Sequence, residues 1–270
     1  MDCFHLLPQE LIPILITHIH HISQVTLRVL LNVDKSWHRI VSQYVIQHNS
    51  IAKQTSNYKL VVYRPLRCDD IAAEGLIEVF KWAVSLGHRM YSGVSVAAAQ
   101  NGHIDLLKWA HSQGCSLINF RICPYAASRG HLEVLQWARS QNCEWDELTC
   151  TFAAMNGQLE VLKWAHSNGC SWSSDTVAEA AKNGHLEVVK WALLNECPHD
   201  WKVCTWSAMN GHLDILKFGK SFGCHVNGSV CEWAAGRGHL EVLLWARENG
   251  CLWSDKADET AKEKWPDKFN

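Results

Sequence analysis

Cysteine and histidine are the residues best suited to chemistry in this chain of 270 residues, which contains 12 cysteines and 16 histidines. Structural zinc needs four converging ligands, usually with about two to four residues between paired ligands. Here Cys143 and Cys150, or Cys224 and Cys231, are separated by six residues, and no CxxC motif occurs. We therefore predict no metal site and no cofactor, and interpret the cysteines as small apolar core residues. A further group, His18, His20 and His21, is expected at the exposed end of a helix.

The histidines recur in a pattern that argues against catalysis. A Cys–His nucleophilic site needs one activated thiol held against one oriented base. Five histidines instead follow a glycine at regular intervals, where we expect them to help cap a helix: His103, His131, His185, His212 and His239. No phosphate-binding loop or GxSxG motif is present. The sequence predicts a protein that is not an enzyme.

An internal repeat explains most of the unusual composition. Residues 130–138 read GHLEVLQWA, 184–192 read GHLEVVKWA and 238–246 read GHLEVLLWA. The repeat glycines are Gly75, Gly102, Gly130, Gly157, Gly184, Gly211 and Gly238. Tryptophan follows the glycine by seven residues in most copies, and cysteine columns lie seven residues before and thirteen after it. In-register copies of this kind indicate a repeat architecture.

Each unit is predicted to contain two helices. The stretch 175–183, DTVAEAAKN, is rich in alanine, and Gly184 suits the left-handed residue that ends a helix. After it, Leu186, Val189 and Ala192 form one apolar helical stripe. A single unit cannot bury this stripe alone, so we expect the units to stack into a solenoid. The charged segment 255–270 has the composition of a terminal cap.

The repeat resembles the ankyrin family. GHLEVLKWAxxxGC aligns without gaps to the second ankyrin helix, GHLEIVKLLLxxGA, and the preceding AAxxG also matches. The ankyrin TPLH turn is missing, and each unit of 27 residues is shorter than the ankyrin norm of about 33. The resemblance implies an all-α, ankyrin-like helix-pair solenoid with shortened hairpins over residues 67–270. Short, Trp-rich units of this kind also resemble those in proteins of large amoeba-infecting DNA viruses.

The segment before the repeats resembles an F-box. The pattern LPxEL appears as Leu7-Pro8-Gln9-Glu10-Leu11, and later positions match at Ile14, Leu27, Leu30, Val33 and Trp37. Pro13, inside the first expected helix, and Asp34, in place of a small Cys or Ser, depart from the family. The resemblance implies a three-helix F-box-like domain at 1–48 and a linker at 49–66. The alternative is an N-terminal helical cap for the solenoid.

Composition and charge narrow the partners. The formal net charge of −2 is not typical of a nucleic-acid binder, which would present a basic face. No apolar run approaches the ~18–20 residues of a membrane span. The N-terminus has no basic segment and no small-residue cleavage site, so we expect no secretory signal, reduced thiols and a cytoplasmic protein. If the source is viral, host cytoplasm or nucleus is expected.

Residues that differ between units are the candidates for target recognition. In ankyrin proteins the finger and the two residues before the glycine bind partners, and aromatic and Arg side chains are common anchors. The candidates here are Asn101, Arg129, Trp145, Asn156, Trp172, Lys182, Asn210 and Arg237. The alternative for Trp145 and Trp172 is packing against the next unit. The aromatic residues five before the glycine align with a core ankyrin leucine and are interpreted as packing: Tyr125, Phe152, Trp206 and Trp233.

Taken with the two resemblances, these features imply a non-enzymatic adaptor that is monomeric when free. The F-box-like segment would dock on a Skp-type adaptor of an SCF cullin–RING ubiquitin ligase through one set of residues: Leu7, Pro8, Leu11, Ile14, Val33 and Trp37. The repeats would hold a target protein for ubiquitination, which raises the effective concentration of its lysines. The alternative is a non-catalytic ankyrin scaffold or inhibitor whose N-terminal helices cap the solenoid.

Overall fold

The computed structural model describes residues 68–85, 88–117 and 121–269. The chain divides into two compact units, Met1–Ile122 and Cys123–Asn270. The predicted F-box-like segment and linker lie outside the described residues, as do their proposed contact residues Leu7, Pro8, Leu11, Ile14, Val33 and Trp37. Across the described ranges the secondary structure is helical, with no strand, which confirms the all-α class for this part of the chain.

The helices come in pairs, as the repeat predicts. The first unit contains α4 (Cys68–Ala73), α5 (Ile77–Ser85), α6 (Ser92–Gln100) and α7 (Ile104–Ser112), and α8 (Ile122–Ser128) begins at the boundary. The second unit contains α9 (Leu132–Ser140), α10 (Glu147–Met155), α11 (Leu159–Ser167), α12 (Ser174–Lys182), α13 (Leu186–Leu194), α14 (Lys202–Met209), α15 (Leu213–Ser221), α16 (Gly228–Arg237), α17 (Leu240–Glu248), α18 (Asp255–Lys264) and α19 (Pro266–Phe269). We term the even-numbered helices up to α18 inner helices and the odd-numbered helices up to α17 outer helices.

The turn between the two helices of a repeat depends on its glycine. Gly184 has a φ of +82°, a left-handed conformation that other residues adopt at a cost. The Gly184 amide donates to Ala181 O at 3.4 Å, and the His185 amide donates to Ala180 O at 3.0 Å. These two bonds satisfy carbonyls at the end of α12, in the pattern of a Schellman motif. The chain then enters α13 at once, so the two helices form a hairpin.

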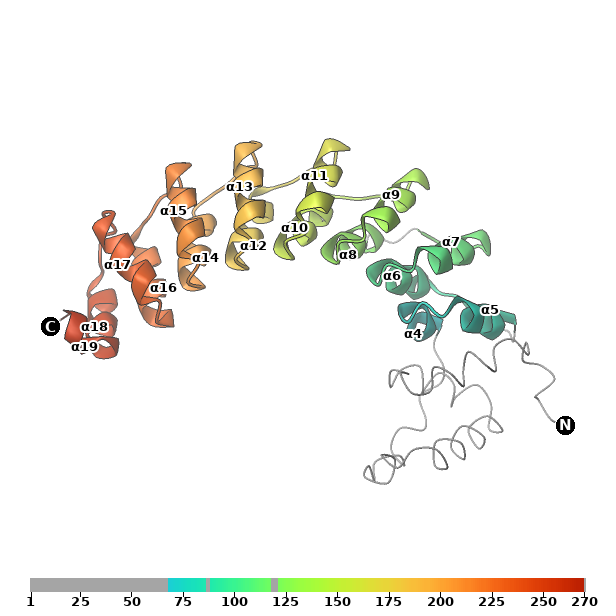
Figure 1. Cartoon of the computed structure of the whole chain (residues 1–270), viewed down its shortest axis with the longest axis horizontal. Helices are drawn as coiled ribbons and strands as arrows, with labels where there is room; N and C mark the ends of the chain where they lie inside the picture. Colours follow the sequence, from blue (N-terminus) through green and yellow to red (C-terminus); the bar gives the residue numbers. More distant parts are fainter. Residues whose placement is uncertain (1–67, 86–87, 118–120, 270) are drawn as a thin grey trace, which may run out of the picture. The chain divides into compact units, whose positions relative to one another are not determined.

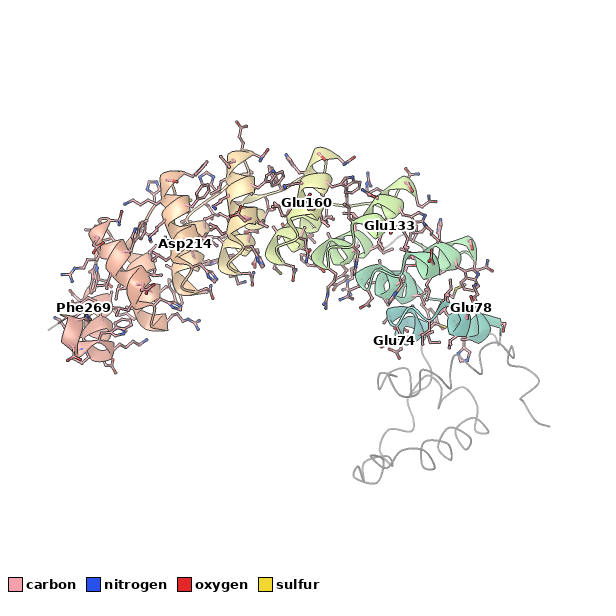
Figure 2. All side chains as sticks on the ribbon, viewed as in Figure 1. Glu74, Glu78, Glu133, Glu160, Asp214 and Phe269 are labelled. Carbon is pink, nitrogen blue, oxygen red and sulfur yellow. A yellow bond between two sulfur atoms is a disulfide. The ribbon has the colours of Figure 1, made fainter. Side chains whose placement is uncertain are left out.

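Inner and outer helices of the second unit lie in two rows (Figure 1). Neighbouring inner helices, such as α10 and α12 or α12 and α14, pack closely along their length. Their alanines allow this approach, because Ala180 and Ala181 are completely buried. The outer helices bury one side, which in α13 consists of Val188, Val189, Ala192 and Leu193, whereas the predicted Leu186 is half-buried. In Figure 2 the labelled acidic residues Glu133, Glu160 and Asp214 lie on outer helices, where the first helical turn favours a carboxylate.

The repeat histidines connect one repeat to the previous one. His185 is the N-cap residue of α13, but its side chain makes no capping bond to that helix. Its Nε2 instead lies 3.0 Å from Met155 O, thirty residues back. The same contact joins His103 to Ala73 O, His212 to Lys182 O and His239 to Met209 O. The prediction that these side chains cap the second helix is wrong, because a carbonyl at the end of the preceding inner helix is within reach.

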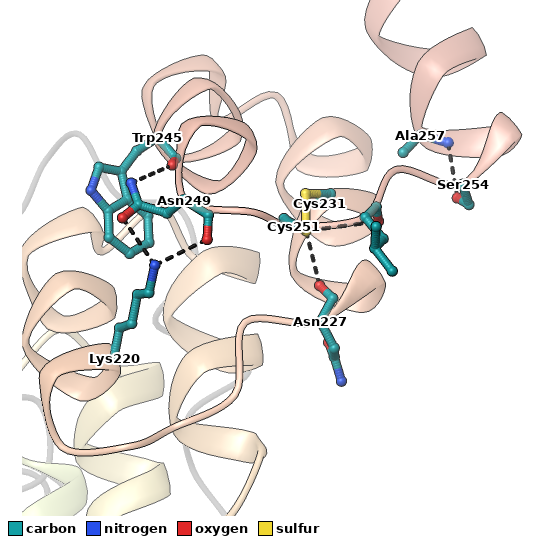
Figure 3. Close-up of a disulfide and its surroundings, with 9 residues drawn as sticks. Lys220, Asn227, Cys231, Trp245, Asn249, Cys251, Ser254 and Ala257 are labelled. Atoms are coloured by element: carbon teal, nitrogen blue, oxygen red, sulfur yellow. Dashed lines mark hydrogen bonds between the residues drawn. A yellow bond between two sulfur atoms is a disulfide. The ribbon is translucent and has the colours of Figure 1, made fainter.

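The cysteine columns lie in the core. Outside the disulfide, the described cysteines are buried, which confirms their interpretation as packing residues. Cys231 and Cys251 are joined by a disulfide (Figure 3). The expectation that the thiols are reduced is therefore wrong for this pair. The two residues are twenty positions apart, and the hairpin of α16 and α17 brings them together.

Candidate protein-binding face

The inner helices of the second unit carry one side that is not repeated. Residues nine, five and two positions before each repeat glycine follow one another at i, i+4 and i+7, so they share a helix face. We call their set on α10, α12, α14 and α16 the variable face. It consists of Leu148, Phe152, Met155, Asp175, Glu179, Lys182, Lys202, Trp206, Met209, Ser229, Trp233 and Gly236. All of them are half-buried or exposed, whereas the alanines between them are buried. The repeats therefore present a constant interior and a changing surface.

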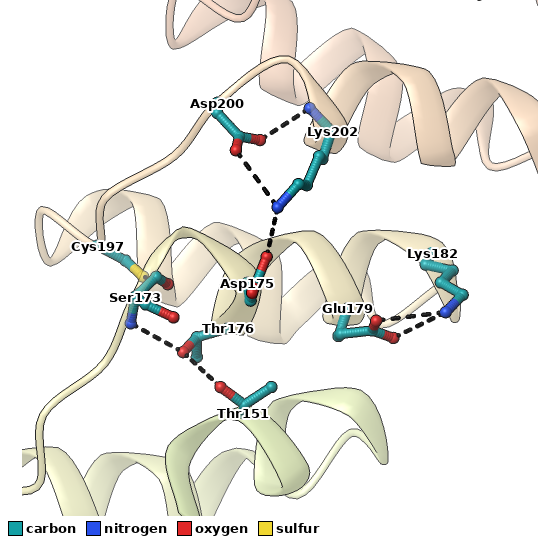
Figure 4. Close-up of polar contacts among 9 residues, drawn as sticks. All are labelled: Thr151, Ser173, Asp175, Thr176, Glu179, Lys182, Cys197, Asp200 and Lys202. Carbon is teal, nitrogen blue, oxygen red and sulfur yellow. Dashed lines mark hydrogen bonds and ion pairs between the residues drawn. The ribbon is translucent and has the colours of Figure 1, made fainter. Parts of the chain in front are cut away.

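Charged side chains on α12 and α14 form the best-defined part of this face (Figure 4). Lys202 Nζ lies 2.6 Å from Asp175 Oδ1 and 3.7 Å from Asp200 Oδ2. The hydrogen bond to Asp175 raises the pKa of Lys202. Lys182 Nζ pairs with Glu179 Oε2 at 3.2 Å. These ion pairs run within α12 and between α12 and α14, so they hold the lysine side chains in place.

Two lysines lie near the ring of Trp206. Lys182 Nζ is 5.1 Å and Lys202 Nζ is 5.8 Å from the centroid of its ring. Both distances are within the range of cation–π attraction, which extends to about 6 Å. The indole is half-buried, so part of the ring stays open to solvent. Trp206 is thus a half-buried aromatic side chain with two ammonium groups near its ring.

Of the four aromatic residues expected to pack in the core, Trp233 departs from the expectation. Trp233 was interpreted as packing, but 44% of its surface is exposed. Tyr125, Phe152 and Trp206 are half-buried, and the Tyr125 and Phe152 ring centroids lie 6.1 Å apart. The ankyrin alignment placed these residues in the core, but here the alanines next to them face the neighbouring helices. Their variation between otherwise constant units was the signal that could have identified them.

The predicted asparagines close their own helices. The side-chain amide of Asn101 donates to Ala97 O, that of Asn156 to Phe152 O and that of Asn210 to Trp206 O, each at 2.9 Å. All three residues are exposed, next to the residues two before the glycine. These bonds are sufficient to explain why asparagine stands at the end of each helix. Target contact through these residues stays a prediction.

The predicted basic residues fall into two groups. Lys182 belongs to the variable face. Arg237 comes directly after Gly236, the last residue of that face, and its guanidinium carbon lies 6.0 Å from the Trp233 ring centroid. Arg129 is exposed just after α8. The structure therefore places Lys182 near the ring of Trp206, where Lys202 also lies, and places Arg237 near the ring of Trp233.

The two loop tryptophans pack against outer helices. The Trp145 ring centroid lies 5.7 Å from that of Trp164, and the Arg139 guanidinium is 4.3 Å from the Trp145 centroid. Trp172 stacks on His166 with centroids 3.7 Å apart and lies 5.6 Å from Trp191. Both loop tryptophans are half-buried. The packing alternative accounts for their geometry, and partner binding by Trp145 and Trp172 remains a prediction.

The described residues contain no group of three or more His, Cys, Asp or Glu side chains placed to hold a metal ion. A membrane-spanning helix was also sought among them, and no helix is long and apolar enough. The surface chemistry in this part of the chain is that of aromatic rings, amides and ion pairs.

Comparison with known proteins agrees with the helix-pair geometry. The family model for ankyrin repeats in many copies matches residues 123–166. This range covers helices α8 to α11 except Ile122, the first residue of α8, and Ser167, the last residue of α11. No curated protein sequence matches the chain. The crystal structure of the human ASB11 ankyrin repeat domain is similar to it, with a TM-score of 0.54 and 13% sequence identity over 66% of this chain and 96% of that chain. Residues 123–166 therefore match ankyrin repeats, and the described part of the chain has an ankyrin-like helical solenoid fold.

Proposed function

We propose that this protein is an adaptor that binds a target protein through the variable face and a ubiquitin-ligase component through residues 1–48. The observation that carries the target-binding half is the cluster of Trp206, Lys182 and Lys202 on an otherwise constant repeat. Aromatic and cationic side chains held in one orientation are common binding anchors, because little side-chain entropy is lost when they are covered. The second aromatic, Trp233, extends the same surface along the next inner helix.

The ligase half of the proposal is supported by the F-box-like sequence. Leu7 and Pro8 begin the LPxEL pattern, and Val33 and Trp37 continue it. The segment would dock on the Skp-type adaptor of an SCF cullin–RING ligase, and the repeats would hold the target nearby. The viral resemblance supports a cytoplasmic or nuclear host target. The competing function is an ankyrin scaffold or inhibitor without a ligase partner.

Photo-cross-linking tests the target-binding face. We would place p-benzoylphenylalanine at position 206 in the full chain and, as a matched control, at Glu160 on the outer helix α11, whose side chain is 78% exposed. A specific cross-linked protein at position 206, absent at position 160 and lost on adding Trp233→Ala, is expected. Equal capture at both positions would exclude the variable face as the binding site.

Calorimetry tests the ligase half. Purified Skp-type adaptor would be titrated into wild type, a Leu7→Ala/Pro8→Ala variant and a Trp37→Ala variant, each with its melting transition checked first. We expect sub-micromolar affinity for wild type and loss of binding by the folded Leu7/Pro8 variant. A well-folded wild type that does not bind would favour the scaffold and leave the variable face to be tested by itself.

A further inference from the structure

The two cysteine columns of the sequence meet inside single repeats. A cysteine seven residues before the glycine and one thirteen after it are twenty positions apart. Four repeats contain both members: Cys123 and Cys143, Cys150 and Cys170, Cys204 and Cys224, and Cys231 and Cys251. The last pair is the disulfide of Figure 3. Because all four pairs occupy the same position in the repeat, the disulfide is one member of a series.

The other three pairs are in contact as thiols. A Cβ added at Gly219 would lie 3.6 Å from both Cys204 Sγ and Cys224 Sγ, and Cys150 Sγ lies 3.9 Å from Cys170 O. In all three pairs the two thiols shift the pKa of one another. The second cysteines of two pairs also have the same surroundings. Cys170 Sγ lies 3.2 Å from the carbonyl of Asp146, the N-cap of α10, and Cys251 Sγ lies 3.0 Å from the carbonyl of Asn227, the N-cap of α16. Cys170 is therefore placed in its repeat as Cys251 is placed in the disulfide.

We propose that the four cysteine pairs are a repeated disulfide-forming site, so that a small-molecule disulfide such as oxidised glutathione can cross-link each of these repeats within itself. In each closure one protein thiolate attacks the oxidant's S–S bond and forms a mixed disulfide, releasing one glutathione. The second protein thiol loses its proton and displaces the other glutathione. Two protein thiols are oxidised to one disulfide, and one glutathione disulfide is reduced to two thiols.

The second cysteine of each pair is the attacking group. Cys143, Cys170 and Cys224 are 4%, 3% and 6% exposed, whereas their partners are completely buried. The contact with its partner lowers the pKa of each of these three thiols, and the same contact and burial raise the pKa of the partners. An oxidant reaches the second cysteine first, because only this cysteine retains exposed surface.

Other repeats provide built-in controls. Cys115 faces Ser95, with Ser95 Oγ 3.2 Å from Cys115 Sγ. Val177 stands twenty positions before Cys197, and burial raises the pKa of Cys197 to about 12. In the first repeat, His88 stands twenty positions after Cys68. These three cysteines have no cysteine at the paired position, so they stay thiols when the four pairs close.

Closure would tie the inner helix of a repeat to the loop that follows its outer helix. A cross-link of this kind stabilises chiefly by restricting the unfolded chain. In a stack of repeats, stability is approximately the sum of contributions from units and interfaces. The inferred effect is an oxidant-dependent stiffening of the array, repeat by repeat.

Peptide mapping of the full folded chain tests the proposal. The fully reduced protein would be treated with excess oxidised glutathione, unfolded in the presence of iodoacetamide, digested and analysed by mass spectrometry. Alkylation should fall from all 12 cysteines to Cys3, Cys68, Cys115 and Cys197, with four cross-linked peptides in the paired register. Circular dichroism would verify that the chain stays folded. Closure only in urea, closure of Cys231 and Cys251 alone, or mixed pairings such as Cys170 with Cys197 would overturn the proposal.

A gain and a loss of one pair sharpen the test. Val177→Cys should add a fifth cross-link, to Cys197, whereas the matched Val177→Ser should leave Cys197 alkylated. Cys204→Val copies the residue found at position 177 and should remove one cross-link while retaining the other three. Oxidation should raise the melting midpoint of wild type more than that of Cys204→Val, and dithiothreitol should reverse the shift. If folded Val177→Cys forms no cross-link, the position in the repeat does not determine closure.

Discussion

Inner helices and outer helices of the second unit contribute differently to the same core. Inner helix α12 buries Thr176, Val177, Ala178, Ala180 and Ala181, so it is covered on more than one side by small residues. Outer helix α11 buries one stripe, Val161, Leu162 and Ala165. Small residues permit close approach, while larger ones fill the space between two helices. The inner row therefore has little room left for variation except on the variable face.

Core substitutions should have the largest effect. Leu162→Ala in α11 should lower the free energy of unfolding by about 2–5 kcal/mol, because it leaves a cavity. Ala154→Leu in α10 should cost about 1–3 kcal/mol through overpacking between inner helices. Both residues are completely buried. Urea unfolding would measure each value, with exposed Glu160→Ala as the control. A neutral Ala154→Leu would contradict the close packing of the inner row.

Two repeat glycines provide the next comparison. Gly184 and Gly238 have φ values of +82° and +85°, so alanine at either is strained by about 1–2 kcal/mol. A Cβ at Gly184 would also lie 2.8 Å from His212 Cε1, whereas Gly238 has no neighbour within 4 Å. Gly184→Ala should therefore be more destabilising than Gly238→Ala, by about 1 kcal/mol or more. Thermal and urea unfolding would measure the difference.

A double-mutant cycle would assign that difference to its cause. If the imidazole is responsible, Gly184→Ala combined with His212→Ala should cost less than the two single changes added together. Strict additivity would show that backbone strain alone accounts for the loss.

The bond between repeats should have a smaller effect. His185→Ala removes the contact of Nε2 with Met155 O and should cost about 0.5–1.5 kcal/mol. His185→Gln should retain more stability, because Gln158 replaces histidine at the equivalent position and lies over Gly130. Unfolding free energies of the two variants would be compared. Equal losses would indicate that the imidazole ring itself, and not a donor at this position, is required.

The exposed ion pair on the variable face should have the smallest effect on stability. The folded-state pKa of Lys202 is raised by Asp175, so its contribution is complete below the unfolded pKa and is lost as pH rises through the folded value. Lys202→Ala should therefore lower the melting midpoint slightly at neutral pH and make no difference in strongly alkaline solution. Melting curves across that range, with Lys163→Ala on an outer helix as the matched control, would measure it. A difference that grew with pH would contradict this sign.

Several elements were predictable because their causes are local. The helix pairs, their left-handed glycines and the apolar stripe of α13 follow from contacts within about one repeat. The cysteines were also correctly interpreted as buried, apart from the disulfide of Cys231 and Cys251. For the variable face, target contact by Lys182 stays a prediction. The packing interpretation does not fit the exposed Trp233, because alignment to longer repeats does not show which side of a helix stays open.

The repeat, the two helices in each unit and the all-α class of the described residues can be read from the sequence, because periodicity and turn residues act over short distances. Tertiary structure decided that His185 bonds to Met155 O thirty residues away, and that Cys204 meets Cys224. It also decided that Lys182 and Lys202, from consecutive inner helices, lie beside Trp206. These contacts depend on how hairpins close and how repeats stack, and that geometry is set by the packing of alanine-rich helices against one another.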